Sequence, residues 1–429
     1  MGRLGSDAVH VRERKARLRL GEALNPRRLY FTLEFLLAMG TGWVVFDLYL
    51  VNVLRLTPLQ LILMGTVMEA TIFVCEVPTG IIADTYSRKL SYVAGVLGTG
   101  TATMLVGLTS TAWIAIALWG FWGLSYTFTS GAFEAWVTDE IGVENVGSLF
   151  LRGRRAALGG SLVGLAGAVA VGAFSLRAAI VASGALQISA GVLCIAAMRE
   201  TGFVRRPPQV RRLFRTAVEG VRFMRGSTLL LLLAATEVFG GFGAEAFDRL
   251  TEAHVIRDIG FPSSITPVYG FGVVSAISMV FGFFAVRPLI RRIDRDGITA
   301  VARMLVLFTL ATVAAQILFA VGDGFWLVMA FFLAAILTRG FLGPLYTTWL
   351  NDLVTDSSVR ATVLSISGQA NAIGQAAGGP VLGVLGNVFG IPYALVAGAL
   401  TTLPAAALYA RATQRQALLR PAEVGGEGW

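Results

Sequence analysis

Long apolar stretches recur along this chain and limit the folds open to it more than any other feature. Each stretch between Tyr30 and Ala410 holds about twenty residues, enough for a helix to cross the roughly 30 Å of hydrocarbon in a bilayer. Hydrophobic residues make up 55% of the sequence and charged residues only 14%, whereas soluble domains carry about a quarter charged residues. We therefore expect an all-α membrane protein.

Twelve such spans can be placed, six on each side of the longest polar connection. The expected organisation is a basic N-terminal segment (1–28), a six-helix half (29–198), a linker (199–228), a second six-helix half (229–410) and a tail (411–429). The individual spans are expected at 30–53, 58–83, 91–109, 111–137, 156–176, 178–198, 229–250, 266–286, 299–321, 325–350, 362–388 and 391–410.

The basic residues follow the order of the loops. Most of the 35 Lys and Arg lie in the N-terminal segment, the even-numbered connections and the tail, and only Arg55, Arg177, Arg249 and Arg257 lie in odd-numbered connections. The positive-inside rule then predicts that both termini are cytoplasmic in a multi-pass protein of the plasma or bacterial inner membrane. It also explains the net charge of +9 without a nucleic-acid partner.

The linker carries its own helical pattern. Apolar residues from Val210 to Met224 fall at helical spacing, and arginines occupy the other positions. This pattern predicts an amphipathic helix lying on the anionic lipids of the membrane surface. The alternative is a solvated basic linker.

A short internal repeat supports the division into halves. The residues Trp136 to Asp139, at the end of span four, recur as Trp349 to Asp352 at the end of span ten. Duplicated halves are a structural device of many secondary transporters, in which the substrate site lies at the interface of the repeats. The repeat therefore favours an alternating-access transporter.

The connection between spans two and three carries a recognisable motif. A glycine, a small residue and an aspartate precede a basic pair. This loop resembles the signature loop of the major facilitator superfamily, and it departs from that loop at Thr85 and Ser87, where the family commonly has arginine and glycine. The resemblance implies a twelve-helix secondary transporter, a monomer, with a small-molecule substrate. The matching residues are Gly80, Ala83, Asp84, Arg88 and Lys89.

The charges of this loop suggest a conformational latch. Arg88 and Asp139 are both expected at the cytoplasmic ends of first-half helices, where they can form a charge-assisted pair. Asp84 is expected to interact with the positive N-terminal end of span eleven, near Thr362. Such contacts would hold the cytoplasmic side closed. In the alternative, Arg88 and Lys89 only set the topology.

Ionisable residues near the middle of a span are costly and need an explanation. Three are expected there, namely Glu69 in span two, Glu237 in span seven and Arg339 in span ten. The resemblance implies that spans one, four, seven and ten line a central cavity, which selects Glu237 and Arg339. These two either form a structural ion pair or open on binding substrate or a proton. Glu69 either carries a transported proton or is a neutral structural group.

Further candidates are polar or aromatic residues of the spans. Glu134 lies on the predicted cavity-lining span four, whereas Glu34 and Asp47 lie nearer the membrane surfaces, where water or neighbouring helices can satisfy them. An acidic, aromatic cavity suits an amphipathic organic cation, although Arg339 can equally attract an anion and the aromatic residues can serve packing alone. The remaining candidates are Trp122, Tyr126, Asn371 and Gln375.

The sequence lacks the residue patterns that nucleotide binding, metal binding or hydrolytic catalysis would require. We find no phosphate-binding loop, no zinc-spaced cluster and no Ser-His-Asp set, and His10 and His254 lie outside the expected spans. We therefore expect no cofactor, no metal and no enzymatic activity. The expected function is secondary transport. The leading candidate is an antiporter that exports a small amphipathic compound in a proton-coupled process. The alternatives are a lipid or organic-anion carrier and a non-transporting receptor or scaffold.

Overall fold

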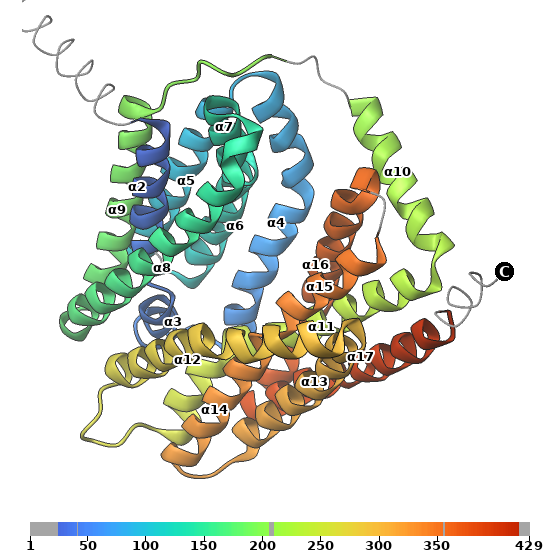
Figure 1. Cartoon of the computed structure of the whole chain (residues 1–429). Coiled ribbons are helices and arrows are strands. Elements are labelled where there is room, and N and C mark those ends of the chain that lie inside the picture. Colours follow the sequence, from blue (N-terminus) through green and yellow to red (C-terminus); the bar gives the residue numbers. More distant parts are fainter. Residues whose placement is uncertain (1–24, 41, 206–209, 355–356, 420–429) are drawn as a thin grey trace, which may run out of the picture. The chain divides into compact units, whose positions relative to one another are not determined.

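The computed structural model describes residues 25–40, 42–205, 210–354 and 357–419, and the backbone of these residues forms helices joined by short loops, without strands (Figure 1). Their contacts divide the chain into two compact units. The first unit contains Met1–Leu54 and Thr71–Gln209, and the second contains Arg55–Ala70 and Val210–Trp429.

The first unit is a helical bundle in which α2, α5 and α9 begin at polar side-chain caps. The Asn25 side chain accepts a hydrogen bond from the Arg27 amide at the start of α2, and Ser87 and Ser175 cap α5 and α9 in the same way. Helix α5 packs on α6 and α9, and α2 packs on α8. The helices are α2 (Pro26–Met39), α3 (Trp43–Asn52), α5 (Arg88–Leu108), α6 (Ala112–Thr129), α7 (Ala132–Ile141), α8 (Val143–Phe174) and α9 (Leu176–Ala197).

The second unit is built around α11, which packs against both α16 and α17, while α13 packs on α14 and α17. Ser227 caps α11 through the Leu230 amide. The helices are α10 (Val210–Gly226), α11 (Thr228–His254), the short π-helix η1 (Val255–Ile259), α12 (Pro267–Asp296), α13 (Ile298–Val321), α14 (Phe325–Arg339), α15 (Leu342–Leu353), α16 (Ser357–Val388) and α17 (Ile391–Leu419).

Helix α4 (Pro58–Thr85) contributes to both units, with the division after Ala70. In its first part, the Leu59 amide donates to Asn387 Oδ1 of α16 over 3.0 Å. In its second part, Thr79 Oγ1 donates to the Thr127 carbonyl of α6 over 3.1 Å. The helix is continuous across the point where its contacts change.

Each unit buries the tryptophan of the repeated motif. Trp136 packs in a core with Tyr30, Tyr92 and Phe133, and Trp349 packs in the core of the second unit with Tyr346. Both indole rings are fully buried. The repeat therefore marks the same kind of packing position in the two units.

Three spans that we expected to be continuous are each two helices. Span one breaks between α2 and α3, span four between α6 and α7, and span ten between α14 and α15. The break in span four falls at Ser130 and Gly131, where Gly131 has a φ of 71°, a left-handed conformation that glycine adopts without steric cost. Hydropathy averages over such a break because the residues on both sides stay apolar.

Among the described residues, nine helical stretches are long and apolar enough to cross a membrane. They leave out the expected spans four, eight and eleven, although α12 contributes a shorter apolar segment, Pro267–Gly282. Helices occupy all three of these positions. The chain is an all-α, multi-pass membrane protein, and the total of twelve spans stays a prediction.

Candidate functional site

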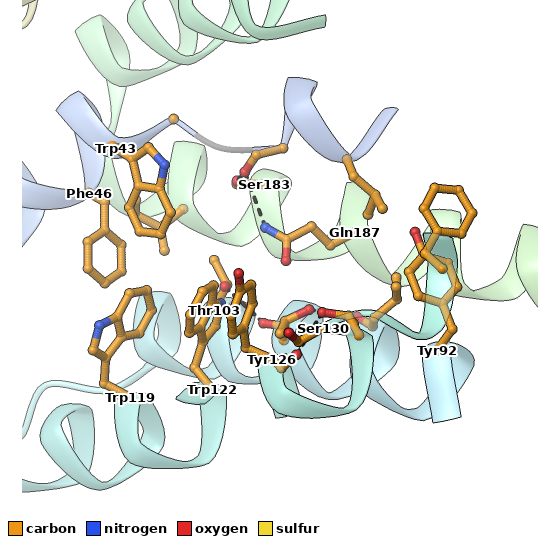
Figure 2. Close-up of a pocket in the computed structure, with 18 of the residues that line it drawn as sticks. Trp43, Phe46, Tyr92, Thr103, Trp119, Trp122, Tyr126, Ser130, Ser183 and Gln187 are labelled. Atoms are coloured by element: carbon orange, nitrogen blue, oxygen red, sulfur yellow. Dashed lines mark hydrogen bonds between the residues drawn. The ribbon is translucent and has the colours of Figure 1, made fainter. Parts of the chain in front are cut away.

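The first unit encloses a cavity of about 350 Å³ that is lined by residues of α3, α5, α6, α7 and α9. Figure 2 shows its aromatic side chains, with Trp119, Trp122 and Tyr126 on one side and Trp43 and Phe46 facing them. The cavity includes three residues named from the sequence as candidates, which are Trp122, Tyr126 and Glu134.

The rings on α6 form a stacked ladder. Trp119, Trp122 and Tyr126 recur at helical spacing, so their side chains share one face of the helix. The ring centroids of Trp119 and Trp122 are 5.1 Å apart and those of Trp122 and Tyr126 are 5.4 Å apart, with interplanar angles of 19° and 8°. Trp43 meets the first two rings edge-on at 6.1 and 6.0 Å. The ladder presents flat aromatic surface to the cavity.

Polar groups surround this aromatic surface. Glu134 is the single Asp, Glu, Lys or Arg side chain among the described residues that line the cavity. Gln187 donates to the carbonyl of Gly40 over 3.2 Å, and Ser183 donates to the same carbonyl, which is freed by the break between α2 and α3. Glu34 lies near enough to Glu134 and Arg154 to interact with both electrostatically. The cavity therefore combines aromatic faces with negative charge.

The second unit holds a smaller cavity of about 270 Å³ with a chain of polar side chains. Asn371 Nδ2 donates to Glu237 Oε2 over 3.0 Å, and Gln375 Nε2 donates to Asn371 Oδ1 over 2.6 Å. Arg339 lines the same cavity. Four residues predicted as candidates thus lie together in this unit.

The pairing of Arg339 differs from the ion pair with Glu237 that the sequence suggested. The Arg339 guanidinium binds both carboxylate oxygens of Asp248, with Nη2 to Oδ2 at 2.6 Å. Asp248 lies eleven residues after Glu237 on α11, which is about 16 Å along a helix axis. Span boundaries estimated from hydropathy misjudge the relative depth of residues on two helices, so they chose the wrong carboxylate.

The motif loop forms a dense set of contacts within the first unit. Arg88 pairs with Asp139, as the sequence suggested, and it also donates to the Ala135 carbonyl over 3.0 Å and pairs with Asp84 at 3.3 Å. Lys89 Nζ donates to the carbonyls of Ile195 and Met198 at the end of α9. A Cβ at Gly80 would have no heavy atom within 4 Å, so the small size of this glycine serves no close contact here.

The remaining candidates lie elsewhere. Glu69 belongs to the part of α4 in the second unit and interacts electrostatically with Glu245. Asp47 is half-buried on α3 and lies outside the residues that line the two cavities described above. The described residues contain no cluster of three or more His, Cys, Asp or Glu side chains that could hold a metal ion.

Sequence reasoning missed two features of these sites. Trp119 completes the aromatic ladder, and its spacing from Trp122 and Tyr126 was a visible signal. Glu245 lies towards the outer end of the expected seventh span, a position that predicts contact with water, whereas its side chain is 1% exposed. Nothing in the sequence marks Glu245 as buried, because it is close to Asp248, Arg249 and Glu252.

Comparisons with known proteins agree on one family. The chain matches the Major Facilitator Superfamily over residues 30–314. It is 24% identical over 393 residues to a protein of Bacillus subtilis (strain 168) named "Uncharacterized MFS-type transporter YxaM", and the match covers 87% of this chain and 92% of the relative.

Solved structures share the fold at lower identity. A mutant of the nucleoside transporter NupG superposes with a TM-score of 0.76 at 14% identity, covering 90% of this chain and all of the other. A bacterial homologue of the human lysosomal transporter Spinster, inward-facing and unoccupied, gives a TM-score of 0.71 at 16% identity, covering 93% and 97%. A POT family transporter bound to a thioalcohol-conjugated peptide gives 0.71 at 12% identity, covering 91% and 96%. The chain is therefore a membrane transporter that belongs to the major facilitator superfamily.

Proposed function

We propose that this transporter works by alternating access and exports a small amphipathic compound, with organic cations as the leading class, in exchange for protons. The observation that carries the proposal is the aromatic cavity of the first unit (Figure 2). Flat aromatic faces attract a cation by about 0.5–2 kcal/mol per ring. Glu134 supplies a negative charge beside them, and the lining described for this cavity includes no basic side chain.

The size of the cavity fits this class of compound. Ligand pockets of proteins commonly enclose about 300–1,000 Å³, and this cavity lies at the lower end with about 350 Å³. Its stacked rings favour a planar or partly planar apolar body. Since the names of structural relatives mention nucleosides and peptides, both classes belong in a substrate screen.

An organic-anion or lipid carrier is the second candidate. Its support is Arg339, which lines two cavities of the second unit. The support is weaker, because both nitrogens of the Arg339 fork already bind Asp248 and an incoming anion would have to displace that carboxylate. A scaffold without transport is the third candidate, and the absence of flux would identify it.

A binding screen based on tryptophan fluorescence tests the proposed cavity. Three of the eight tryptophans line it, so a bound aromatic cation should change their emission. Trp122→Ala and Glu134→Gln should each weaken the affinity for a cation by about threefold to thirtyfold. Trp326→Ala is the matched control, because Trp326 is 71% exposed and lies in the other unit.

Transport is tested with the purified protein in proteoliposomes. A panel of amphipathic cations, anions, nucleosides, peptides and neutral compounds is offered with an imposed pH gradient. Cation accumulation that requires the gradient, and that falls in Glu134→Gln, supports the proposal. Accumulation of anions alone supports the second candidate, and no flux above empty vesicles rejects transport of every class tested.

A further inference from the structure

Helix α11 carries a deeply buried carboxyl group that the proposed function has not used. The Glu245 side chain is 1% exposed, and neither of its oxygens has a hydrogen-bond partner among the described residues. The nearest cation is Arg249, whose Nε lies 3.7 Å from Oε2, beyond hydrogen-bonding distance. An ionised carboxylate in this position would be very costly without stronger partners.

Four charged groups surround Glu245. Asp248 and Arg249 come from α11 itself, Glu69 comes from α4, and Arg339 comes from α14. All five residues belong to the second unit. We call them the α11 charge cluster. Its three acids and two arginines leave one negative charge in excess when every group is ionised, so a single proton makes the cluster neutral.

The partners of the other acids indicate where this proton resides. Asp248 and Arg339 neutralise each other in a bidentate ion pair. Arg249 is then the remaining cation of the cluster. Its guanidinium lies against Gly65 of α4, four residues before Glu69, so closely that a Cβ at Gly65 would collide with it. Glu69 is only partly buried. Glu245 is fully buried, and neutralising it removes the largest desolvation cost.

We propose that Glu245 is a proton-binding site that is occupied in this conformation of the transporter. Release of the proton follows from the same contacts. If the Arg339–Asp248 pair opens, the Arg339 guanidinium becomes available to stabilise an ionised Glu245, and the proton leaves to water. The pair is reachable for such a change because both residues line a cavity of about 430 Å³.

This arrangement also indicates how a cation could be exchanged for a proton. The step adds a second cation position to the aromatic cavity of the first unit, at Asp248 in the cavity of about 430 Å³ in the second unit. A substrate cation that pairs with Asp248 would replace Arg339 there, and the released arginine would favour loss of the Glu245 proton. One positive charge enters the cluster and one leaves, so the charge of the cluster is unchanged. This step rests on the proposed function, whereas the protonation of Glu245 does not.

Infrared spectroscopy of the purified protein tests the site without any substrate. A protonated carboxyl group has a C=O stretch that is absent from a carboxylate. At neutral pH, the spectrum of wild type minus Glu245→Gln should show one such band. Asp323→Asn is the control, since Asp323 is an exposed acid of the same unit outside the cluster, and it should remove no protonated-carboxyl band. Asp248→Asn frees Arg339 and should therefore lose the Glu245 band, as Glu245→Gln does. Superimposable wild-type and Glu245→Gln spectra in this region would overturn the proposal.

Thermal unfolding provides a second readout. Glu245→Gln resembles the protonated side chain in shape and charge, so its melting temperature should stay close to that of the wild type. Asp248→Asn should melt lower, because it leaves Arg339 without its counterion. A fall in Glu245→Gln as large as that in Asp248→Asn would mean that Glu245 is ionised and paired with Arg249, which contradicts the proposal.

The coupling step has its own test in proteoliposomes. With a substrate from the screen above, Glu245→Gln should abolish the dependence of accumulation on the pH gradient. Unaltered gradient dependence would overturn the role of this proton as the coupling ion. If the wild type transports nothing, the proposed function fails while the infrared result on Glu245 stands.

Discussion

Arg88 connects three parts of the first unit through one guanidinium group. It contacts Asp84 at the end of α4 and Asp139 and the Ala135 carbonyl on α7, and the ring centroid of Phe203 is 5.9 Å from its Cζ. The two carboxylates differ in exposure, with 64% for Asp84 and 26% for Asp139. Their contributions to stability should therefore differ as well.

Replacing the two carboxylates separately tests this difference. Asp139→Ala removes a partner of a side chain that is only 15% exposed, and we expect a loss of about 1–3 kcal/mol in stability. Asp84→Ala removes an exposed ion pair between Asp84 and Arg88, which are four residues apart in the sequence. Such a pair contributes at most about 0.5 kcal/mol to stability. Thermal unfolding in detergent measures both. Equal melting temperatures for the two variants would show that the Arg88–Asp139 contact contributes nothing beyond a surface pair.

Single residues also show how far the site could be predicted. Residue type selected Trp122, Tyr126, Asn371 and Gln375, and the resemblance to the family, which implies cavity-lining spans, selected Glu134 and Glu237. The first two and Glu134 line one cavity, and the other three line another. Residue type and the resemblance were not enough to pair Arg339 with Asp248 or to recognise the burial of Glu245. Pairing and burial depend on the relative depth and rotation of packed helices, and hydropathy does not report either.

At the scale of elements, the lengths of the apolar stretches in the sequence predicted the positions of helices better than the positions of the breaks within them. The expected first span, 30–53, is divided between α2, which ends at Met39, and α3, which begins at Trp43. Most of the expected fifth span, 156–176, lies in a helix that begins at Val143. The early part of α8 carries Arg152, Arg154 and Arg155, so hydropathy ends the span where the charges begin. The backbone remains helical there because its hydrogen bonds do not depend on lipid contact.

Close contact between helices α11 and α16 depends on glycine. A Cβ at Gly374 would lie 2.1 Å from the Val238 carbonyl oxygen, and one at Gly241 would lie 2.2 Å from the Asn371 carbonyl oxygen. The two backbones therefore touch directly, as small residues allow between membrane helices. The helices could not approach this closely with larger residues at either position.

Substitution at this contact should be strongly destabilising. Gly374→Val forces the helices apart, and we expect a cost of about 3 kcal/mol or more from overpacking against a rigid backbone. Gly368→Val is the control on the same helix, because no atom lies within 4 Å of a Cβ at Gly368. Melting temperatures of the two variants check this prediction, and similar values would show that α11 and α16 can separate at little cost.

The whole molecule should have a defined orientation in the membrane. The distribution of basic residues predicts that both termini and the 199–228 connection are cytoplasmic. The helix expected in this connection corresponds to α10, whereas residues 206–209 lie outside the described part of the chain. In a variant without Cys75 and Cys194, a single cysteine near Pro207 should react with an impermeant reagent only after the cells are opened. Labelling from outside intact cells would contradict the predicted topology.

The motif loop leads to a prediction about conformational populations. We expect Asp84 and Arg88 to stabilise the state that is closed to the cytoplasm, through the dipole of span eleven and the Asp139 pair. Asp84→Asn should shift the population towards inward-facing by about 0.3–1 kcal/mol, and Arg88→Ala should shift it in the same direction. Distances between spin labels on cytoplasmic helix ends measure this shift. Unchanged distances in both folded variants would leave these charges a role in topology alone.

The glycine contacts between helices have a consequence for inherited variation. Gly160 and Gly164 of α8 touch the backbone of Phe35 and Met39 on α2, in the same way that Gly374 touches α11 in the other unit. Any single-base change that replaces a glycine codon with that of another amino acid adds side-chain atoms. At these positions every such change meets a main-chain atom that no rotamer can avoid. Chance mutation should therefore be tolerated less along these contacts than among the aromatic and acidic residues that we propose bind the substrate.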